Sequence, residues 1–190
     1  MSEIHDPYAV TPRTVVVPTP TEAIEQRLQF DDFFLDVDLG DGATTASGHR
    51  TASVRFPPGW PGDALDGFEA WAERRRSDAP EGWAATVVDR GTLEAIGQVG
   101  CVAPPDDDGV VEIRYATNAD QRDRGVATEA GGAFVDWLLA RPDVRAVAAE
   151  CRVDNAASVR VIEKLGFVLV DEREDEQGRV LRWVKRRAPG

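Results

Sequence analysis

The chain has 190 residues, 42% of them hydrophobic and 29% charged, which is the length and composition of one globular domain with a substantial core. Its formal net charge of −12 argues against a nucleic acid or an anionic membrane as partner. No apolar run approaches the roughly 20 residues of a membrane span, and residues 1–10 lack the pattern of a signal peptide. We therefore expect a cytoplasmic protein with a flexible tail over residues 1–12 and a single domain over residues 13–187.

Hydrophobic periodicity and the positions of proline and glycine predict an alternation of strands and helices. Residues 36–55 are acidic and glycine-rich and are predicted to be irregular. Thr21 is expected to cap the first helix. The predicted helices cover residues 21–29, 63–76, 126 to the stop at Pro142, and 155–165. The predicted strands cover residues 15–17, 83–88, 95–102, 110–115, 146–153, 167–171 and 180–185.

This order of elements predicts an α+β fold, in which a mixed, mostly antiparallel sheet has helices on both faces. Strands 83–88 and 95–102 are expected to form a hairpin, and the last two strands a second one that turns near residues 177–178. The helical crossover from strand 110–115 to strand 146–153 makes those two strands parallel neighbours.

The cysteines and histidines do not form a metal-binding pattern. Cys101 and Cys151 lie in separate predicted strands and are expected to be small buried residues with reduced thiols. His5 lies in the tail and His49 in the glycine-rich loop, each without a plausible set of co-ligands. We expect no metal.

Acidic residues gather at residues 31–41, 106–108 and 171–176. Each group by itself is typical of a solvated loop or turn. Together the three groups would attract a cationic substrate over a long range.

The segment that follows strand 110–115 has the features of a phosphate-binding loop. A helix that begins there leaves backbone N–H groups unpaired beside the positive end of its dipole. Arg122 and Arg124 lie in the first turn, where a cation opposes the dipole unless an anion is bound. Gly125 permits close approach of a ligand. The alternative is an ordinary exposed helix start, and the spacing matches neither a Walker loop nor a dinucleotide-binding motif.

Two motifs resemble the GNAT superfamily of N-acetyltransferases. Arg122-x-x-Gly125-x-Ala127 is similar to its Q/R-x-x-G-x-G/A pyrophosphate-binding signature. Residues 150–167 resemble the strand, the Asn-x-x-Ser helix and the Glu-Lys-x-Gly-Phe ending of the branch typified by ribosomal-protein N-terminal (RimJ/RimL-type) acetyltransferases. The resemblance is dense over residues 97–184 and thin before them.

The resemblance implies a cosubstrate, acetyl-CoA, whose thioester lies between two strands that splay apart, here 110–115 and 146–153. It implies backbone contacts to the pantetheine and an oxyanion N–H from residues 115–117, and phosphate contacts from the loop. The residues expected to bind acetyl-CoA are Tyr115, Ala116, Thr117, Arg122, Asp123, Arg124, Gly125, Val126, Ala127, Thr128, Asn155 and Ser158.

Acetyl transfer to an amine needs a base for the ammonium proton and an acid for the leaving thiolate. Glu112 is the candidate base, because it alternates with Ile113 along its strand and because the resemblance places an acidic residue there. A solvent-facing strand glutamate is the alternative, with Glu150 as a second candidate for the base. Many members of the family carry a tyrosine as the acid at the position of Ile162, which has no proton to donate.

Ser158, or water, is therefore the candidate acid. Asn155 fits both a helix N-cap and the asparagine that bonds the pantetheine arm in the family. Gly166 is expected to follow this helix in a left-handed conformation.

We expect an acetyl-CoA-dependent N-acetyltransferase in which a primary amine attacks directly. The acceptor is expected to be a protein N-terminus, an aminoglycoside-like amine or another small cationic amine, bound by helices 21–29 and 63–76 and the loop between them. Trp60 is either a wall of that acceptor site or core filler. The alternatives are a non-catalytic acyl-CoA-binding or regulatory module of the same fold and a nucleotide-binding protein. The oligomeric state is open, and a homodimer is one possibility.

Overall fold

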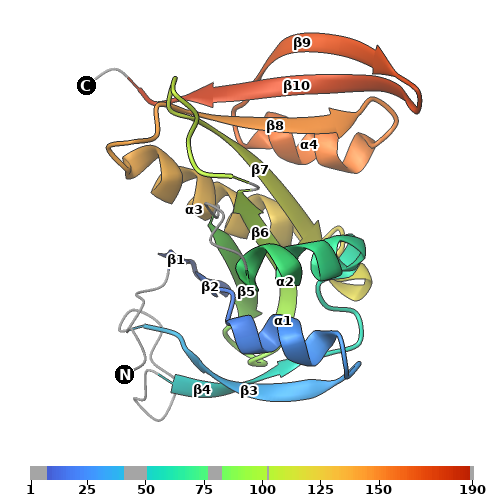
Figure 1. Cartoon of the computed structure of the whole chain (residues 1–190). Helices are drawn as coiled ribbons and strands as arrows, with labels where there is room; N and C mark the ends of the chain where they lie inside the picture. Colours follow the sequence, from blue (N-terminus) through green and yellow to red (C-terminus); the bar gives the residue numbers. More distant parts are fainter. Residues whose placement is uncertain (1–7, 41–50, 77–82, 102, 189–190) are drawn as a thin grey trace.

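A computed structural model describes residues 8–40, 51–76, 83–101 and 103–188. Eight strands form one sheet in the order β1-β2-β5-β6-β7-β8-β10-β9, and β3 and β4 pair separately (Figure 1). The strands are β1 Ala9–Val10, β2 Thr14–Pro18, β3 Phe33–Asp38, β4 Thr51–Phe56, β5 Ala84–Asp89, β6 Ala95–Cys101, β7 Val110–Thr117, β8 Ala146–Arg152, β9 Val168–Asp175 and β10 Gly178–Arg186. The helices are α1 Thr21–Arg27, η2 Gly62–Gly67, α2 Phe68–Arg76, η3 Ala119–Gln121, α3 Val126–Ala140 and α4 Ala156–Lys164.

Within the large sheet, neighbouring strands are antiparallel except β7 and β8, which are parallel and joined by the crossover through α3. This confirms the predicted mixed, mostly antiparallel sheet. Helices cover both faces: α3 packs with Val16 of β2, whereas α1 and α2 pack with Val15 and Val17 of the same strand, whose side chains point the other way.

The parallel strands β7 and β8 separate before they end. Their pairing runs from Val110 beside Ala146 to Ile113 beside Ala149 and stops there. Beyond that point β7 continues to Thr117, paired with β6, and β8 continues to Arg152, paired with β10. The ends of β7 and β8 thus bound a wedge, and the expected splay of these strands is confirmed.

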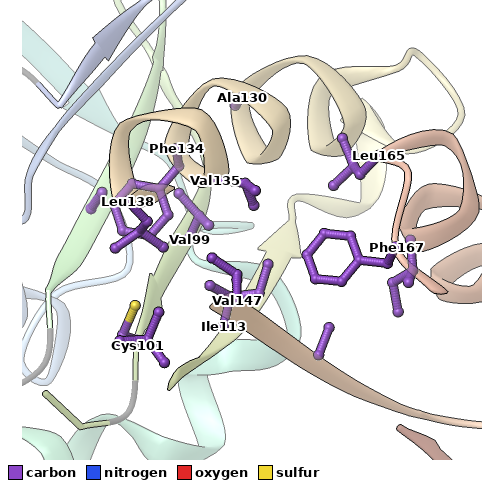
Figure 2. Close-up of a cluster of buried hydrophobic side chains, with 14 of the residues drawn as sticks. Val99, Cys101, Ile113, Ala130, Phe134, Val135, Leu138, Val147, Leu165 and Phe167 are labelled. Carbon is purple, nitrogen blue, oxygen red and sulfur yellow. The ribbon is translucent and has the colours of Figure 1, made fainter. Parts of the chain in front are cut away.

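The larger core lies between the sheet and α3. Phe134, Val135 and Leu138 of α3 are fully buried and face Val99 and Ile113 of the sheet (Figure 2). The core continues from there to the end of α4, where Leu165 and Phe167 lie against the same cluster (Figure 2).

The predicted left-handed conformation of Gly166 after α4 is confirmed. Gly166 has φ +79°, its N–H bonds to the carbonyl of Glu163, and the N–H of Phe167 bonds to that of Ile162. This pair of bonds is a Schellman motif, which requires a left-handed residue and so favours glycine.

The second core lies under α1, α2 and the β3–β4 hairpin. It is rich in aromatic side chains: the rings of Phe33 and Phe56 stack with centroids 4.9 Å apart, and Trp60 meets Phe56 and Phe68 edge to face. Trp60 is fully buried and its indole N–H donates to the Gly97 carbonyl at 3.2 Å. Trp60 is therefore a buried core residue, the second of the two roles expected for it.

Three local predictions differ from the structure. Residues 36–55 were expected to be irregular, but residues 33–38 and 51–56 pair as β3 and β4, because alternating apolar side chains on both strands cover the second core. Thr21 is the first residue of α1 and not its N-cap, since Pro20 takes that position without a side-chain bond. Residues 62–67, expected to be largely α-helical, form the 3₁₀ helix η2 before α2.

The predicted tail, residues 1–12, is structured in its described part. Residues 9 and 10 pair with β2, and the ring of Tyr8 lies 4.4 Å from that of Trp137 on α3, measured between centroids. Apolar contact with α3 holds this segment on the domain. Within the described ranges, no helix is both long enough and apolar enough to cross a membrane.

Candidate active site

The loop between β7 and α3 presents a row of backbone N–H groups. Asp123 and Gly125 have φ +59° and +78°, and Gly125 is the N-cap of α3. In the described parts of the chain, no hydrogen bond is formed by the N–H groups of residues 123–128. Consecutive free N–H groups at a helix start form a concave site for an anion, which is the geometry expected for phosphate. The side chain of Val126 is buried in the core, so this residue offers only its N–H.

A residue that sequence reasoning missed holds this loop in place. Arg13, in the turn between β1 and β2, donates from Nη1 to the Arg124 carbonyl at 2.9 Å and from Nε to Glu129 Oε2 at 2.6 Å. The hydroxyl of Thr11 donates to the other oxygen of Glu129 at 2.6 Å. Partial burial would raise the pKa of Glu129, but the hydrogen bonds from Thr11 and Arg13 outweigh it and lower that pKa. Arg13 and Glu129 are distant in sequence, and no local pattern marks them as partners.

The two arginines of the loop have different surroundings. Arg122 Nη2 donates to both carboxylate oxygens of Asp63 on η2, at 2.8 and 2.9 Å. Its guanidinium therefore points to η2, and it must exchange this exposed partner before it can bind a phosphate. Arg124 is exposed, and its backbone carbonyl is the group that Arg13 binds.

Alternation along β7 decides which backbone groups point into the wedge. The Asn118 N–H donates to the Ile96 carbonyl of β6 at 3.0 Å, so the backbone groups of Ala116, two residues before it, also point to β6. The N–H and C=O groups of Tyr115 and Thr117 point the other way, toward the gap between β7 and β8. The backbone groups of Ala116 therefore do not face the gap in which the pantetheine was expected, whereas those of Tyr115 and Thr117 do.

The end of β7 is tightly packed from the other side. Gly62 has φ +69°, and a Cβ atom at this position would lie 2.8 Å from the Thr117 carbonyl oxygen. A Cβ atom on Gly97 of β6 would lie 2.6 Å from the Ala116 carbonyl oxygen. Asn118 Nδ2 also donates to the Ala95 carbonyl at 2.9 Å. Backbone therefore lies directly against backbone here, and this edge of the wedge is rigidly placed.

Two buried amide oxygens lie at this end of β6 and β7. Gln98 Oε1 and Asn118 Oδ1 accept no hydrogen bond from the described residues. Asn118 is an even number of residues from Glu112 along the chain, and Gln98 pairs with Ala116, which is too. The side chains of Gln98 and Asn118 therefore lie on the same face of the sheet as that of Glu112. They are acceptors available to a bound donor or to water.

The start of α4 faces the wedge from β8. Asn155 is the N-cap of α4, and its Oδ1 accepts from the Ser158 N–H at 3.0 Å, as predicted for a cap. Ser158 is half-buried, and its carbonyl accepts a 3.3 Å bond from the hydroxyl of Tyr115. Burial raises the pKa of Tyr115, so this hydroxyl keeps its proton at neutral pH. A contact between β7 and α4 thus spans the wedge. Ile162, in contrast, is buried in the core.

The two candidate bases have different surroundings. Glu112 lies beside Ala148 of β8, one residue before the last paired position, on the face opposite the buried Ile113. Its Oε1 is 3.6 Å from Arg114 Nη2. Glu150 accepts two 2.7 Å bonds from Arg173 and one of 3.0 Å from Arg182. The bond from Arg173 is the main reason that the pKa of Glu150 is lowered, which makes it a weaker base. Glu112 remains the better candidate.

The predicted site residues thus gather around one wedge. The loop lies beyond the end of β7, Glu112 lies where β7 and β8 separate, and Ser158 lies on the opposite side with Asn155. Cys101 and Cys151 are free and buried, as expected. Burial raises the pKa of Cys101 to about 12. The described residues contain no group of three or more side chains that could hold a metal, and His5 and His49 lie outside them.

Known acetyltransferases are similar to this chain in sequence and in fold. The family model of the acetyltransferase (GNAT) domain matches residues 35–168. The uncharacterized N-acetyltransferase YjdG of Bacillus subtilis (strain 168) is 37% identical over 83 residues, which are 44% of this chain and 49% of that protein. The chain therefore matches about half the length of this curated relative.

Solved structures share the fold along almost the whole chain. RimL, the ribosomal L7/L12 alpha-N-protein acetyltransferase in complex with coenzyme A, matches with a TM-score of 0.62 and 14% identity, over 95% of this chain and 98% of that one. A chimera of the spermidine N-acetyltransferase SpeG from Vibrio cholerae and hSSAT matches with a TM-score of 0.63 and 11% identity, over 92% and 95%. At these identities the likeness establishes a common fold.

Proposed function

The chain belongs to the GNAT acetyltransferase family, whose cosubstrate is acetyl-CoA, and from that premise we propose that it transfers an acetyl group to a primary amine by direct attack. The observation that carries the proposal is the wedge. Its edges place a row of free N–H groups, a carboxylate and a hydroxyl around the gap between two separating strands. An amine and a thioester held together in such a gap gain most of their rate from positioning.

The loop at residues 122–128 is proposed to bind the pyrophosphate. The free N–H groups of residues 123–128 would donate to it, and the positive end of the α3 dipole would stabilise its charge. Arg124 is free to reach a phosphate, and Arg122 would do so after leaving Asp63. Arg13 is a positioning residue, since it acts on the loop through the Arg124 carbonyl.

The catalytic roles are assigned to two side chains. Glu112 would take the proton of the ammonium, directly or through water, so that the amine nitrogen can attack the thioester carbon. The Tyr115 N–H, which points into the wedge, would donate to the oxyanion. The carbon–sulfur bond then breaks, and the Ser158 hydroxyl or water would give a proton to the thiolate. The proton that the nitrogen loses as the amide forms would restore that donor, directly or through water. Asn155 and the backbone of Thr117 would hold the pantetheine arm.

The first experiment tests the cosubstrate. Ligand at 100 times its Kd stabilises a folded protein by about 2.7 kcal/mol, which raises the Tm of a domain of this size by several degrees. We expect this rise for the wild type with acetyl-CoA and its loss in Arg124→Glu. Arg145→Glu makes the same charge change at an exposed residue near the far end of β8, and it should keep the rise. No rise at millimolar acetyl-CoA would contradict the proposal.

The second experiment tests catalysis by following thiol release with a panel of amines. Glu112→Gln should lower kcat by about 100-fold while acetyl-CoA still raises the Tm. Ser158→Ala tests the acid in the same assay. Acetyl-CoA binding without turnover on any amine would favour a non-catalytic acyl-CoA-binding module. Competition by ATP for the site would favour a nucleotide-binding protein.

A further inference from the structure

The side chains on the Glu112 side of β7, β8, β10 and β9 carry both signs of charge, and Asp171 of β9 lies opposite Arg182 among them. Glu112 and Arg114 share one face of β7 by alternation. Glu150 lies two residues after Ala148, the partner of Glu112, and therefore shares that face. Arg182 of β10 lies opposite Glu150, and Arg173 of β9 donates a hydrogen bond to the Glu150 carboxylate. We call these five residues the Glu112 face: Glu112, Arg114, Glu150, Arg173 and Arg182.

Arg114 is the residue of this face whose guanidinium is most accessible to a ligand. It is the first residue of β7 after the pairing with β8 ends. Its side chain is 75% exposed, and its ion pair with Glu112 is long, at 3.6 Å. No other ion pair of Arg114 is formed within the described ranges. An exposed guanidinium thus stands beside the proposed base.

On the opposite edge of the wedge, the carboxylate of Glu150 is already paired. Both oxygens of Glu150 are occupied by Arg173, and Arg182 adds a third bond. The side chains of Arg173 and Arg182 nevertheless stay 49% and 38% exposed. With Asp171, which lies opposite Arg182 on β9, the charges of this surface balance, and the guanidinium next to Glu112 is that of Arg114, whose ion pair is long.

We propose that the acceptor is an amine with a carboxylate next to it, and that Arg114 binds this carboxylate while the amine faces Glu112. An amino acid and a peptide N-terminus followed by an acidic residue share this chemistry. Arginine suits the role because its planar donors match a carboxylate in a bidentate arrangement. The inference rests on the proposed acetyl transfer, and it reverses the expectation that the overall acidity selects a cationic substrate.

The test compares matched acceptors that differ only in the neighbouring charge. One pair is alanine and alaninamide, and the second is a peptide with Ala-Asp and one with Ala-Asn at its N-terminus; spermidine is added as a polyamine. We expect kcat/KM to favour the carboxylate member of at least one pair by about tenfold or more. The pair with the larger ratio tells a free amino acid from a peptide.

Arg114→Gln should bring that ratio close to one, mainly by raising KM for the carboxylate member. Arg145→Gln, with the same charge change at the far end of β8, should keep the wild-type ratio. Turnover with equal ratios in wild type and Arg114→Gln, or with spermidine as the best acceptor, would overturn the inference and leave the proposed acetyl transfer in place. Absence of turnover with every amine would instead reject both.

Discussion

The two edges of the wedge are built in different ways. The β7 edge is held by buried, uncharged contacts: the indole of Trp60 on the Gly97 carbonyl, and the close approach of Gly97 to Ala116. The β8 edge is paired with β10 and has its inner face in the larger core, and its other face carries the ion pairs of Glu150 with Arg173 and Arg182. Gly62 of η2 lies against Thr117 at the end of β7, whereas β8, β10 and β9 form the outer end of the sheet (Figure 1).

This difference predicts different mechanical properties. Packed backbone and aromatic rings resist displacement and do not respond to salt, because close packing tolerates little change in volume. Exposed ion pairs are screened by salt and contribute little to stability. The β7 edge, which carries Glu112, Arg114 and Tyr115, is therefore the one that salt should affect least. Salt should weaken the ion pairs of Glu150 with Arg173 and Arg182 on the other side of the wedge.

The largest effect is expected at Trp60. Trp60→Ala would leave a cavity among Phe56 and Phe68 and should lower the free energy of unfolding by about 3–5 kcal/mol. Chemical denaturation measures this loss. Phe34→Ala removes an aromatic ring that is 62% exposed on the β3–β4 hairpin, and it should change stability little. Equal losses for the two variants would show that the second core does not support the β7 edge.

Gly97→Ala should cost about 1–3 kcal/mol, because its Cβ would lie 2.6 Å from a backbone oxygen that cannot move freely. The matched control is Gly67→Ala, where an added Cβ meets nothing within 4 Å. Urea unfolding of both variants gives the comparison. If Gly97→Ala is as stable as Gly67→Ala, the β7 edge is looser than its packing indicates.

Asn155→Ala removes the cap of α4 on the β8 side of the wedge. The Ser158 N–H then loses its acceptor, and the expected cost is about 1 kcal/mol. Asn155→Asp should keep most of this stability, since aspartate caps equally well. A loss of the same size in Asn155→Asp would mean that the amide group, and not the cap, is what matters.

The smallest effect is expected at the Glu150 ion pairs, and it depends on pH. Arg173 lowers the pKa of Glu150 below its ordinary value of 4.5, so the pair stabilises the fold above that value and this contribution is lost as the pH falls through the lowered pKa. Arg173→Gln should therefore lower the free energy of unfolding only slightly near neutral pH. The difference from wild type should shrink in acid and in high salt. A difference that grew in acid would contradict the assigned cause.

The sequence predicted the local features of the candidate site but not its long-range contacts. The loop at residues 122–128 and the cap at Asn155 were predicted because each depends on residues a few positions apart. The pairing of residues 33–38 with 51–56 was missed, since glycine and acidic residues between the strands hid their alternation. The charge near the wedge was judged from overall composition, whereas the partners of Glu150 come from two other strands.

What the sequence by itself determined is the order of the main strands and helices from β5 onward, the left-handed turn at Gly166 and the crossover that makes β7 and β8 parallel. These features follow from side-chain periodicity and backbone conformation, which are local properties. The tertiary structure alone decided which charges meet. Arg13 reaches Glu129 and Arg122 reaches Asp63 across long stretches of chain, because packing of the sheet and α3 sets those distances and no spacing along the sequence records them.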